Sequence, residues 1–168
     1  MEHFVRILNF NNRFVNLQLI QTSSIFLQNI SAETKRYYLL SHGFLNKLIA
    51  FPFNFYDEEL VDIYISFLKS LALLLNSNSI QFFYNQKNRH FPLLLMAQKF
   101  AHHPETMVRN AVRIINLTIF KINDKQLNEE VLADMPFCLS FVHLACQLRE
   151  TCNGIDKSYP TQNIINKL

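Results

Sequence analysis

Two consecutive segments between residues 91 and 121 carry the start and stop signals of a helix pair, and this feature constrains the fold more than any other. Pro92 opens the first segment, where the missing N–H of proline has no helical partner to lose, and apolar residues follow. We expect this helix to stop at the histidine pair 102–103. Pro104 then starts the second helix, and Glu105 occupies its first turn, where the helix dipole favours an acid.

The second helix is amphipathic, with an apolar face and a polar stripe opposite to it. Apolar residues recur at helical spacing at Val108, Ala111, Ile115 and Ile119. The polar stripe consists of Glu105, Arg109, Arg113 and Asn116. The two arginines stand four residues apart and repel each other mildly, by about 0.2–0.5 kcal/mol. We therefore predict that an acidic group from elsewhere meets this stripe.

Two interpretations of the polar stripe stay open. In the first, Arg109 and Arg113 form salt bridges with Glu105 and with an acid on a neighbouring helix, and these bridges fix how helical units stack. In the second, Arg109, Arg113 and Asn116 form a partner-binding site that anchors an acidic segment of another protein. The rigid fork of donors on arginine suits that role.

The composition leaves little material for anything but helices. Only 2 Gly and 5 Pro occur among 168 residues, and 49% of the residues are hydrophobic, which can fill a sizeable core. A helical hairpin with a proline at its turn and arginines on its second helix is typical of armadillo and HEAT units. We therefore predict an all-α fold of about seven or eight helices, an armadillo/HEAT-like α-solenoid of antiparallel helices with no sheet.

Other helices are predicted from similar signals. Asn12 starts a long helix that is apolar on more than one face and should be buried, and Ser31 is predicted to cap a short helix after it. Asp57 is predicted to cap the most regular helix, with two acids in its first turn. The expected segments are 12–29, 31–40, 44–51, 57–75, 80–84, 123–134 and 136–151, with Gly154 just past the last one. We expect a helical domain over residues 1–153 and a C-terminal tail over 154–168.

Charge and cysteine usage limit the class of partner and the compartment. The formal net charge is +3, and Lys and Arg are scattered along the chain, which argues against nucleic-acid binding. The three cysteines, Cys138, Cys146 and Cys152, form no CxxC pair, so we expect free thiols in the reducing cytoplasm. The sequence has neither a recognisable signal peptide nor an apolar stretch long enough to cross a bilayer.

A search for catalytic motifs finds no phosphate-binding loop, nucleophile elbow or zinc signature in the sequence. The adjacent residues His102 and His103 point in different directions on a helix end, so we interpret them as capping or surface residues rather than metal ligands. Cys138 and Cys146 lie on an apolar helix, where nothing lowers a thiol pKa, and we interpret them as inert. We predict no catalytic, metal or cofactor-binding residue and expect a non-enzyme.

Several long strings, in order, resemble the FPL domain. They are NISAETKRYYLLS (29–41), FYDEELVDIYISFLKSLALLLN (55–76), IQFFYN (80–85) and FPLLLMAQKFAHHPETMVRNAVR (91–113). The FPL domain is the N-terminal domain of the family that contains C-type lectin domain family member 16A and the fly endosomal maturation defective protein. Members are several times longer than this chain, which is therefore expected to be a piece of a longer protein or a small relative.

The resemblance implies a non-catalytic, armadillo-like scaffold for protein–protein interaction in endosome and lysosome trafficking and in autophagy. Partners implied in the same way are small GTPases, tethering complexes and ubiquitin-ligase components, with peripheral association to endomembranes. No ubiquitin-ligase motif is present in this segment, so that activity is not carried over. The alternative is a structural subunit of a large complex that reuses the fold, and an enzyme is a third hypothesis that no residue supports.

Overall fold

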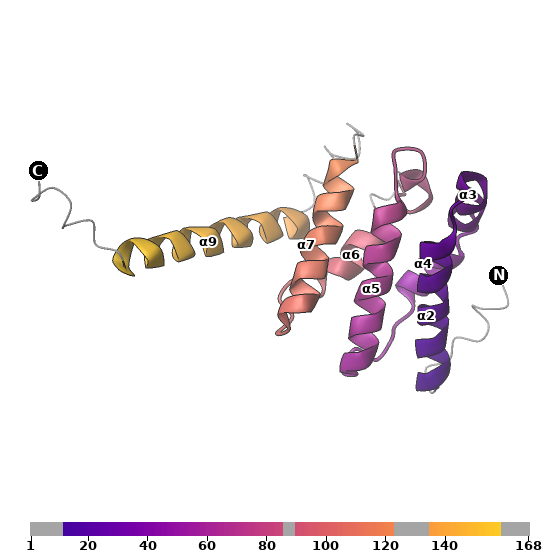
Figure 1. The fold of residues 1–168 in the computed structure, drawn as a ribbon, viewed down its shortest axis with the longest axis horizontal. Helices are drawn as coiled ribbons and strands as arrows, with labels where there is room; N and C mark the ends of the chain where they lie inside the picture. Colours follow the sequence, from indigo (N-terminus) through magenta and orange to yellow (C-terminus); the bar gives the residue numbers. More distant parts are fainter. Residues whose placement is uncertain (1–11, 86–89, 123–134, 159–168) are drawn as a thin grey trace, which may run out of the picture. The chain divides into compact units, whose positions relative to one another are not determined.

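The computed structural model describes residues 12–85, 90–122 and 135–158 (Figure 1). Within these residues the regular structure consists of seven α-helices and one short 3-10 helix, with no strand beyond an isolated β-bridge between Asn85 and His90. The prediction of an all-α chain is therefore confirmed for the described part. The chain divides into two units, residues 1–128 and 129–168, which are described separately.

Three long helices of the first unit stand side by side in one layer. They are α2 (Arg13–Asn29), α5 (Glu58–Leu74) and α7 (Thr106–Lys121), and all three run upward in Figure 1. Helix α5 lies in the middle and packs against both of the others. Two contacts show that α2 and α5 are parallel, because Arg13 bonds to Asp57 at their first ends and Gln28 Nε2 donates to Ser70 Oγ at 3.1 Å near their last ends.

Two short helices, α4 (Phe44–Ala50) and α6 (Pro92–Gln98), pack against each other, and α6 also contacts α5 and α7. Each short helix leads into a long one. Helix α4 begins at residue 44 and α5 at 58, while α6 begins at 92 and α7 at 106, so both pairs have a spacing of 14 residues. We name α4 with α5 the first repeat and α6 with α7 the second repeat, which follows it by 48 residues.

The two repeats bury equivalent positions of their long helices. In α5 the buried residues include Leu60, Tyr64, Phe67, Leu68 and Leu71, and the residues 48 positions later in α7 are also buried, namely Val108, Val112, Ile115, Asn116 and Ile119. The hydroxyl of Tyr64 donates to the Ile49 carbonyl oxygen at 2.7 Å, and its ring lies 5.1 Å from that of Phe55 and 6.1 Å from that of Phe100. An aromatic cluster therefore joins the two repeats.

Local signals placed several helix ends correctly. Asp57 is the N-cap of α5, and its Oδ1 accepts from the Leu60 N–H at 3.4 Å, as predicted. Gly43, with φ of +64°, makes the turn between α4 and α3 (Glu33–Ser41). The predicted Ser31 cap is wrong, because α3 starts at Glu33 behind an extended Ala32 and has no side-chain cap.

The helix pair that dominates the sequence differs from expectation at its turn. Helix α6 ends at Gln98 rather than at the histidines. The N–H groups of Phe100 and Ala101 donate to the carbonyl oxygens three residues earlier, as in a 3-10 turn, instead of four residues earlier as in an α-helix. This turn lets the Phe100 ring reach Phe55, at 5.1 Å. Helix α7 starts at Thr106 rather than at Pro104, since Glu105 is extended and serves as the N-cap.

Two more helices depart from the prediction. Helix α2 is buried along one side, but Phe14, Ile25 and Phe26 are exposed, so its apolar residues are not all packed. Helix α9 (Met135–Ser158) continues past Thr151 and through Gly154, because one exposed glycine costs about 1 kcal/mol relative to alanine and does not stop a helix. The helix predicted over 123–134 and most of the predicted tail lie outside the described residues. The short 3-10 helix η1 (Ile80–Phe82) matches the helical turn predicted at 80–84.

Candidate functional site

Arg109, the first predicted partner-binding residue, is held by its own turn. Its Nη1 donates to the carbonyl oxygens of His103 at 2.7 Å and Pro104 at 2.6 Å, and its Nη2 donates to Thr106 Oγ1 at 2.8 Å. Within the described residues these oxygens, rather than the Glu105 carboxylate, satisfy the guanidinium. Arg109 therefore ties the α6–α7 turn to the first turn of α7.

Arg113 and Asn116, the other two predicted residues, lie in different surroundings. Arg113 is half-buried, and its Nη1 donates to Asn110 Oδ1 at 3.0 Å. Asn116 is only 5% exposed, and its Oδ1 accepts from Gln98 Nε2 of α6 at 3.1 Å. The structure thus places Asn116 in the packing between α6 and α7, away from the exposed stripe that the spacing indicated.

Arg109 and Arg113 lie on a flank of α7 whose equivalent in α5 is covered by a neighbouring helix. Ile63 and Ser66 of α5 border a hollow with α2, whereas Val61, Ile65 and Ala72 lie on the other flank of α5 and are buried. Helix α7 packs on that flank, which we call the far flank of α5. The far flank of α7, 48 positions later, consists of Arg109, Arg113 and Phe120. The predicted arginines therefore lie on α7 at the positions that are equivalent to the flank of α5 on which the next long helix packs.

A second cluster, which the sequence did not indicate, joins the starts of α2 and α5. Arg13 forms ion pairs with Asp57 and Glu59, and its Nη2 also donates to Asp57 Oδ1 at 3.2 Å. Hydrogen bonding from Arg13 lowers the pKa of Asp57 below its ordinary value. The partners are 44 and 46 residues apart in the chain, so no local spacing could have revealed the cluster.

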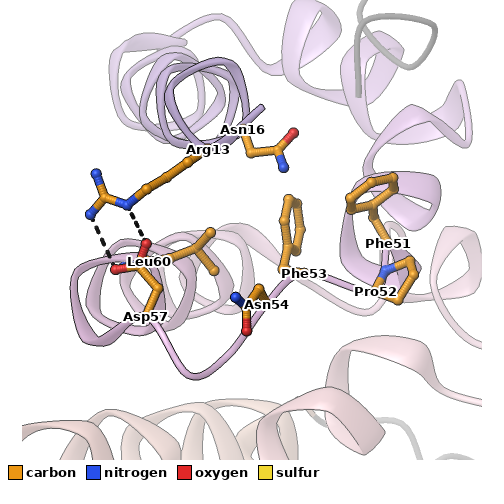
Figure 2. Close-up of a pocket in the computed structure, with 8 residues that line it drawn as sticks. All are labelled: Arg13, Asn16, Phe51, Pro52, Phe53, Asn54, Asp57 and Leu60. Carbon is orange, nitrogen blue, oxygen red and sulfur yellow. Dashed lines mark hydrogen bonds and ion pairs between the residues drawn. The ribbon is translucent and has the colours of Figure 1, made fainter. Parts of the chain in front are cut away.

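This cluster borders a hollow of about 200 Å³ (Figure 2). Figure 2 shows the Arg13–Asp57 pair on one side and the aromatic connection 51–53 on the other, with the Asn16 and Asn54 side chains at the edge. Its lining contains the Arg13 guanidinium paired with the Asp57 carboxylate, two amides and apolar rings, a set suited to recognition.

The remaining candidates for chemistry have structural surroundings. His103 Nδ1 accepts from the Glu105 N–H at 3.2 Å, which agrees with the structural role predicted for this histidine. In the described part of the chain, Cys146 is half-buried and Cys152 exposed, both as free thiols, while the Cys138 side chain lies outside the description. No group of three potential metal ligands occurs among the described residues. The described helices also include none that is long and apolar enough to cross a membrane.

Comparison with known families places the chain. The sequence model of FPL, described as an uncharacterised conserved protein, matches residues 1–120. The chain belongs to the FPL family. The match ends one residue before the end of α7, so it covers both repeats of the first unit.

The FPL relatives come from animals and plants. Protein CLEC16A of human is 49% identical over 113 residues, 67% of this chain and 11% of that protein. The Drosophila melanogaster CLEC16A homolog is 44% identical over 125 residues, 74% of this chain and 12% of its own length. Protein TRANSPARENT TESTA 9 of Arabidopsis thaliana is 39% identical over 137 residues, 79% of this chain and 16% of that protein. The chain thus spans less than a fifth of these relatives, and no solved structure matches it.

Proposed function

We propose that this FPL chain is a non-catalytic scaffold for protein–protein interaction, built as an armadillo-like α-solenoid. The observation that carries the proposal is the recurrence of a short helix followed by a long one after 48 residues, with equivalent positions buried. Armadillo and HEAT units recur every 40–47 residues or so, and each unit buries its apolar face only by stacking on a neighbour. The row of α2, α5 and α7 is what such stacking produces.

The non-catalytic part of the proposal rests on how reactive and charged side chains are occupied. Arg109 is bound to carbonyl oxygens, Arg13 to two carboxylates, and His103 to a backbone N–H. These residues stabilise turns and helix starts. A scaffold uses such residues to fix the orientation of its helices, whereas an active site would aim them at a shared reacting atom.

The setting and partners of the proposal come from the family. We propose a role in endosome and lysosome trafficking and in autophagy, with the chain in the cytoplasm and held at endomembranes by its partners. Small GTPases, tethering complexes and ubiquitin-ligase components are the proposed partner classes. The support for these points is the sequence resemblance to the FPL family over residues 1–120.

The second candidate function is a structural subunit of a large complex, and the far flank of α7 favours it. In the first repeat the equivalent flank, Val61, Ile65 and Ala72, is buried by the next helix. A helix that carries carboxylates could pack in the same way on Arg109 and Arg113 of the second repeat. Stacking of the next helix and docking of an acidic partner both place carboxylates on the far flank of α7, beside Arg109 and Arg113.

Partner recovery with charge variants tests the proposal. The tagged chain is expressed in cells, and proteins recovered with it are identified by mass spectrometry for wild type and for Arg109→Glu/Arg113→Glu. The control, Lys35→Glu/Lys47→Glu, reverses two exposed charges on α3 and α4. Arg113→Glu is also measured alone, because Arg109 ties down its own turn. A wild-type chain that recovers no protein above background would contradict the scaffold.

The same variants separate the two interpretations. A lower melting temperature of isolated Arg113→Glu, which leaves the hydrogen bonds of Arg109 in place, supports stacking, whereas an unchanged melt with lost recovery of partners supports a docking site. If neither the melting temperature nor the recovery of partners changes, the arginines form a solvated face, and no binding or stacking role is assigned to them. Size-exclusion chromatography of the isolated chain separates the two candidate functions. A soluble monomer favours the scaffold, whereas a chain that aggregates without its partners favours the structural subunit.

A further inference from the structure

A hollow of about 340 Å³ lies between α2 and α5 on the face away from the short helices. Helix α2 contributes Gln21, Ile25 and Gln28 to its lining, and α5 contributes Asp62, Ile63 and Ser66. Ile25 is 59% exposed although it is aliphatic. The lining therefore combines aliphatic and polar side chains, a combination that binding surfaces use to hold an apolar anchor and orient its neighbours.

The charge of this hollow comes from one residue. Asp62 is exposed, and no hydrogen bond or ion pair joins it to another described residue. Glu59, one turn earlier, is already paired with Arg13, and exposed Glu58 adds a second carboxylate on the same side. Lys69 lies two turns further along α5, beyond the hollow. A ligand that enters at Asp62 therefore meets a negative potential.

We infer that the α2–α5 face binds an extended segment of another protein that places an aliphatic side chain on Ile25 and Ile63 and a basic side chain on Asp62. This inference rests on the proposed scaffold function and names the chemistry of one of its partners. The charge complements Asp62, and the aliphatic anchor removes Ile25 from water.

The geometry favours an extended segment over a helix. Neighbouring helix axes lie about 8–10 Å apart, and an extended chain advances about 3.3 Å per residue, so every third residue meets the next helix of the row. An extended segment brings unpaired backbone N–H and C=O groups. Gln28 Oε1 and Gln21 Nε2 can bond these groups, while Gln28 Nε2 donates to Ser70 and Gln21 Oε1 accepts from Gln18. A helical partner satisfies those groups internally and gains nothing from the amides. Beyond α5, the exposed Asn110 of α7 continues the polar row.

Selection of peptides from a phage-displayed library of random twelve-residue sequences tests the inference on the full chain. Enriched sequences are synthesised with a fluorescent label and titrated by anisotropy against wild type, Asp62→Lys and Ile25→Glu. The control, Glu33→Lys on α3, makes the same change of charge at an exposed position away from the hollow. Circular dichroism melts confirm that each variant is folded.

We expect enriched peptides to share a Lys or Arg next to an aliphatic residue, and Asp62→Lys and Ile25→Glu each to weaken their binding by about tenfold or more. Glu33→Lys should leave the affinity within about twofold, because exposed charges outside an interface contribute little. A peptide whose basic residue is changed to Glu should regain affinity for Asp62→Lys. That charge exchange would place the basic residue on Asp62.

Four results would overturn the inference. The folded chain enriches no peptide, or the enriched peptides lack a basic residue. Alternatively, the peptides bind Asp62→Lys and Ile25→Glu as tightly as wild type, or the bound peptide is helical by NMR. Partner recovery from cells keeps this failure distinct from failure of the proposed function. If the wild-type chain still recovers proteins above background, the scaffold stands and only the α2–α5 assignment falls.

Discussion

The first and second repeats bury the same positions of their long helices but differ in the chemistry of their far flanks. In the first repeat, Val61, Ile65 and Ala72 are buried where α7 packs. In the second, Arg109 and Arg113 are half-buried, and Phe120 is 41% exposed. The inward side of a long helix is thus set by the repeat, whereas each flank is set by what lies beside it. Substitutions at equivalent positions of the two repeats should therefore separate the two kinds of constraint.

The largest effects are expected at the shared core. Phe67→Ala should cost about 3–5 kcal/mol of the free energy of unfolding, because the ring is fully buried and leaves a cavity. The equivalent Ile115→Ala should cost about 2–5 kcal/mol. Urea denaturation followed by circular dichroism measures both. A Phe67→Ala chain with an unchanged midpoint would mean that this face of α5 is not core.

The far flanks of α5 and α7 should differ in how much stability they lose when their residue types are exchanged. Ile65→Arg places an unpaired charge among buried side chains and should cost about 3 kcal/mol or more. The matched change Arg113→Ile, 48 residues later, places an aliphatic side chain at a half-buried position and should cost less, about 1 kcal/mol. The same denaturation measurement applies. Equal losses at the two sites would show that the flanks do not differ in burial.

Position 64 of the first repeat carries a hydroxyl that its counterpart Val112 lacks. Tyr64→Phe should cost about 1–3 kcal/mol, because the change removes the 2.7 Å hydrogen bond and leaves the Ile49 carbonyl unsatisfied in the core. The ring and its packing stay in place. Thermal unfolding gives the size of the loss, and a Tyr64→Phe chain as stable as wild type would mean that the carbonyl finds another donor.

The helix caps provide a smaller contrast. Asp57 accepts a hydrogen bond as the N-cap of α5, whereas Glu105, the equivalent N-cap of α7, makes no side-chain cap bond. Asp57→Ala should therefore cost about 1 kcal/mol, and Glu105→Ala should cost less. Glu105→Asp, which shortens the side chain to capping length, should raise the melting temperature. A loss at Glu105→Ala as large as that at Asp57→Ala would contradict the assignment of the caps.

The smallest effect is a pH dependence of the contact between α2 and the first repeat. Because Arg13 lowers the pKa of Asp57 in the folded chain, the unfolded chain binds more protons as the pH falls below about 5. The stabilisation is present at neutral pH and lost as the pH falls through the folded pKa. Asp57→Asn, which keeps a capping side chain, should flatten this part of the stability profile. A wild-type profile that Asp57→Asn leaves unchanged below pH 5 would exclude the ion pair as its cause.

Much of the fold could be predicted from local signals. Asp57 and Pro92 mark helix starts through a side-chain acceptor and a missing N–H, and each acts within a few residues. Helix ends were harder to place. Helix α6 stops early so that Phe100 can pack on another repeat, which is a tertiary cause that local sequence does not contain.

The candidate site was predicted less well, because its residues depend on contacts between repeats. Asn116 is polar yet buried, since Gln98 supplies its hydrogen bond across the helix pair. Arg13 finds its partners 44 and 46 residues away. The repeat itself is hard to read from the sequence, because burial recurs while residue types change, as from Leu68 to Asn116.

The parallel row of α2, α5 and α7 is the central claim, and distances between spin labels test it most directly. Labels are introduced at exposed positions as Gln18→Cys/Asn110→Cys, Asn29→Cys/Lys121→Cys and Gln18→Cys/Lys121→Cys, in a chain whose three natural cysteines are replaced by Ser. A parallel row with α5 between α2 and α7 predicts similar separations of about 20 Å for the first two pairs, and a longer one for the third. A third distance shorter than the first would contradict the account, as would separations of the first two pairs that differ by a helix length.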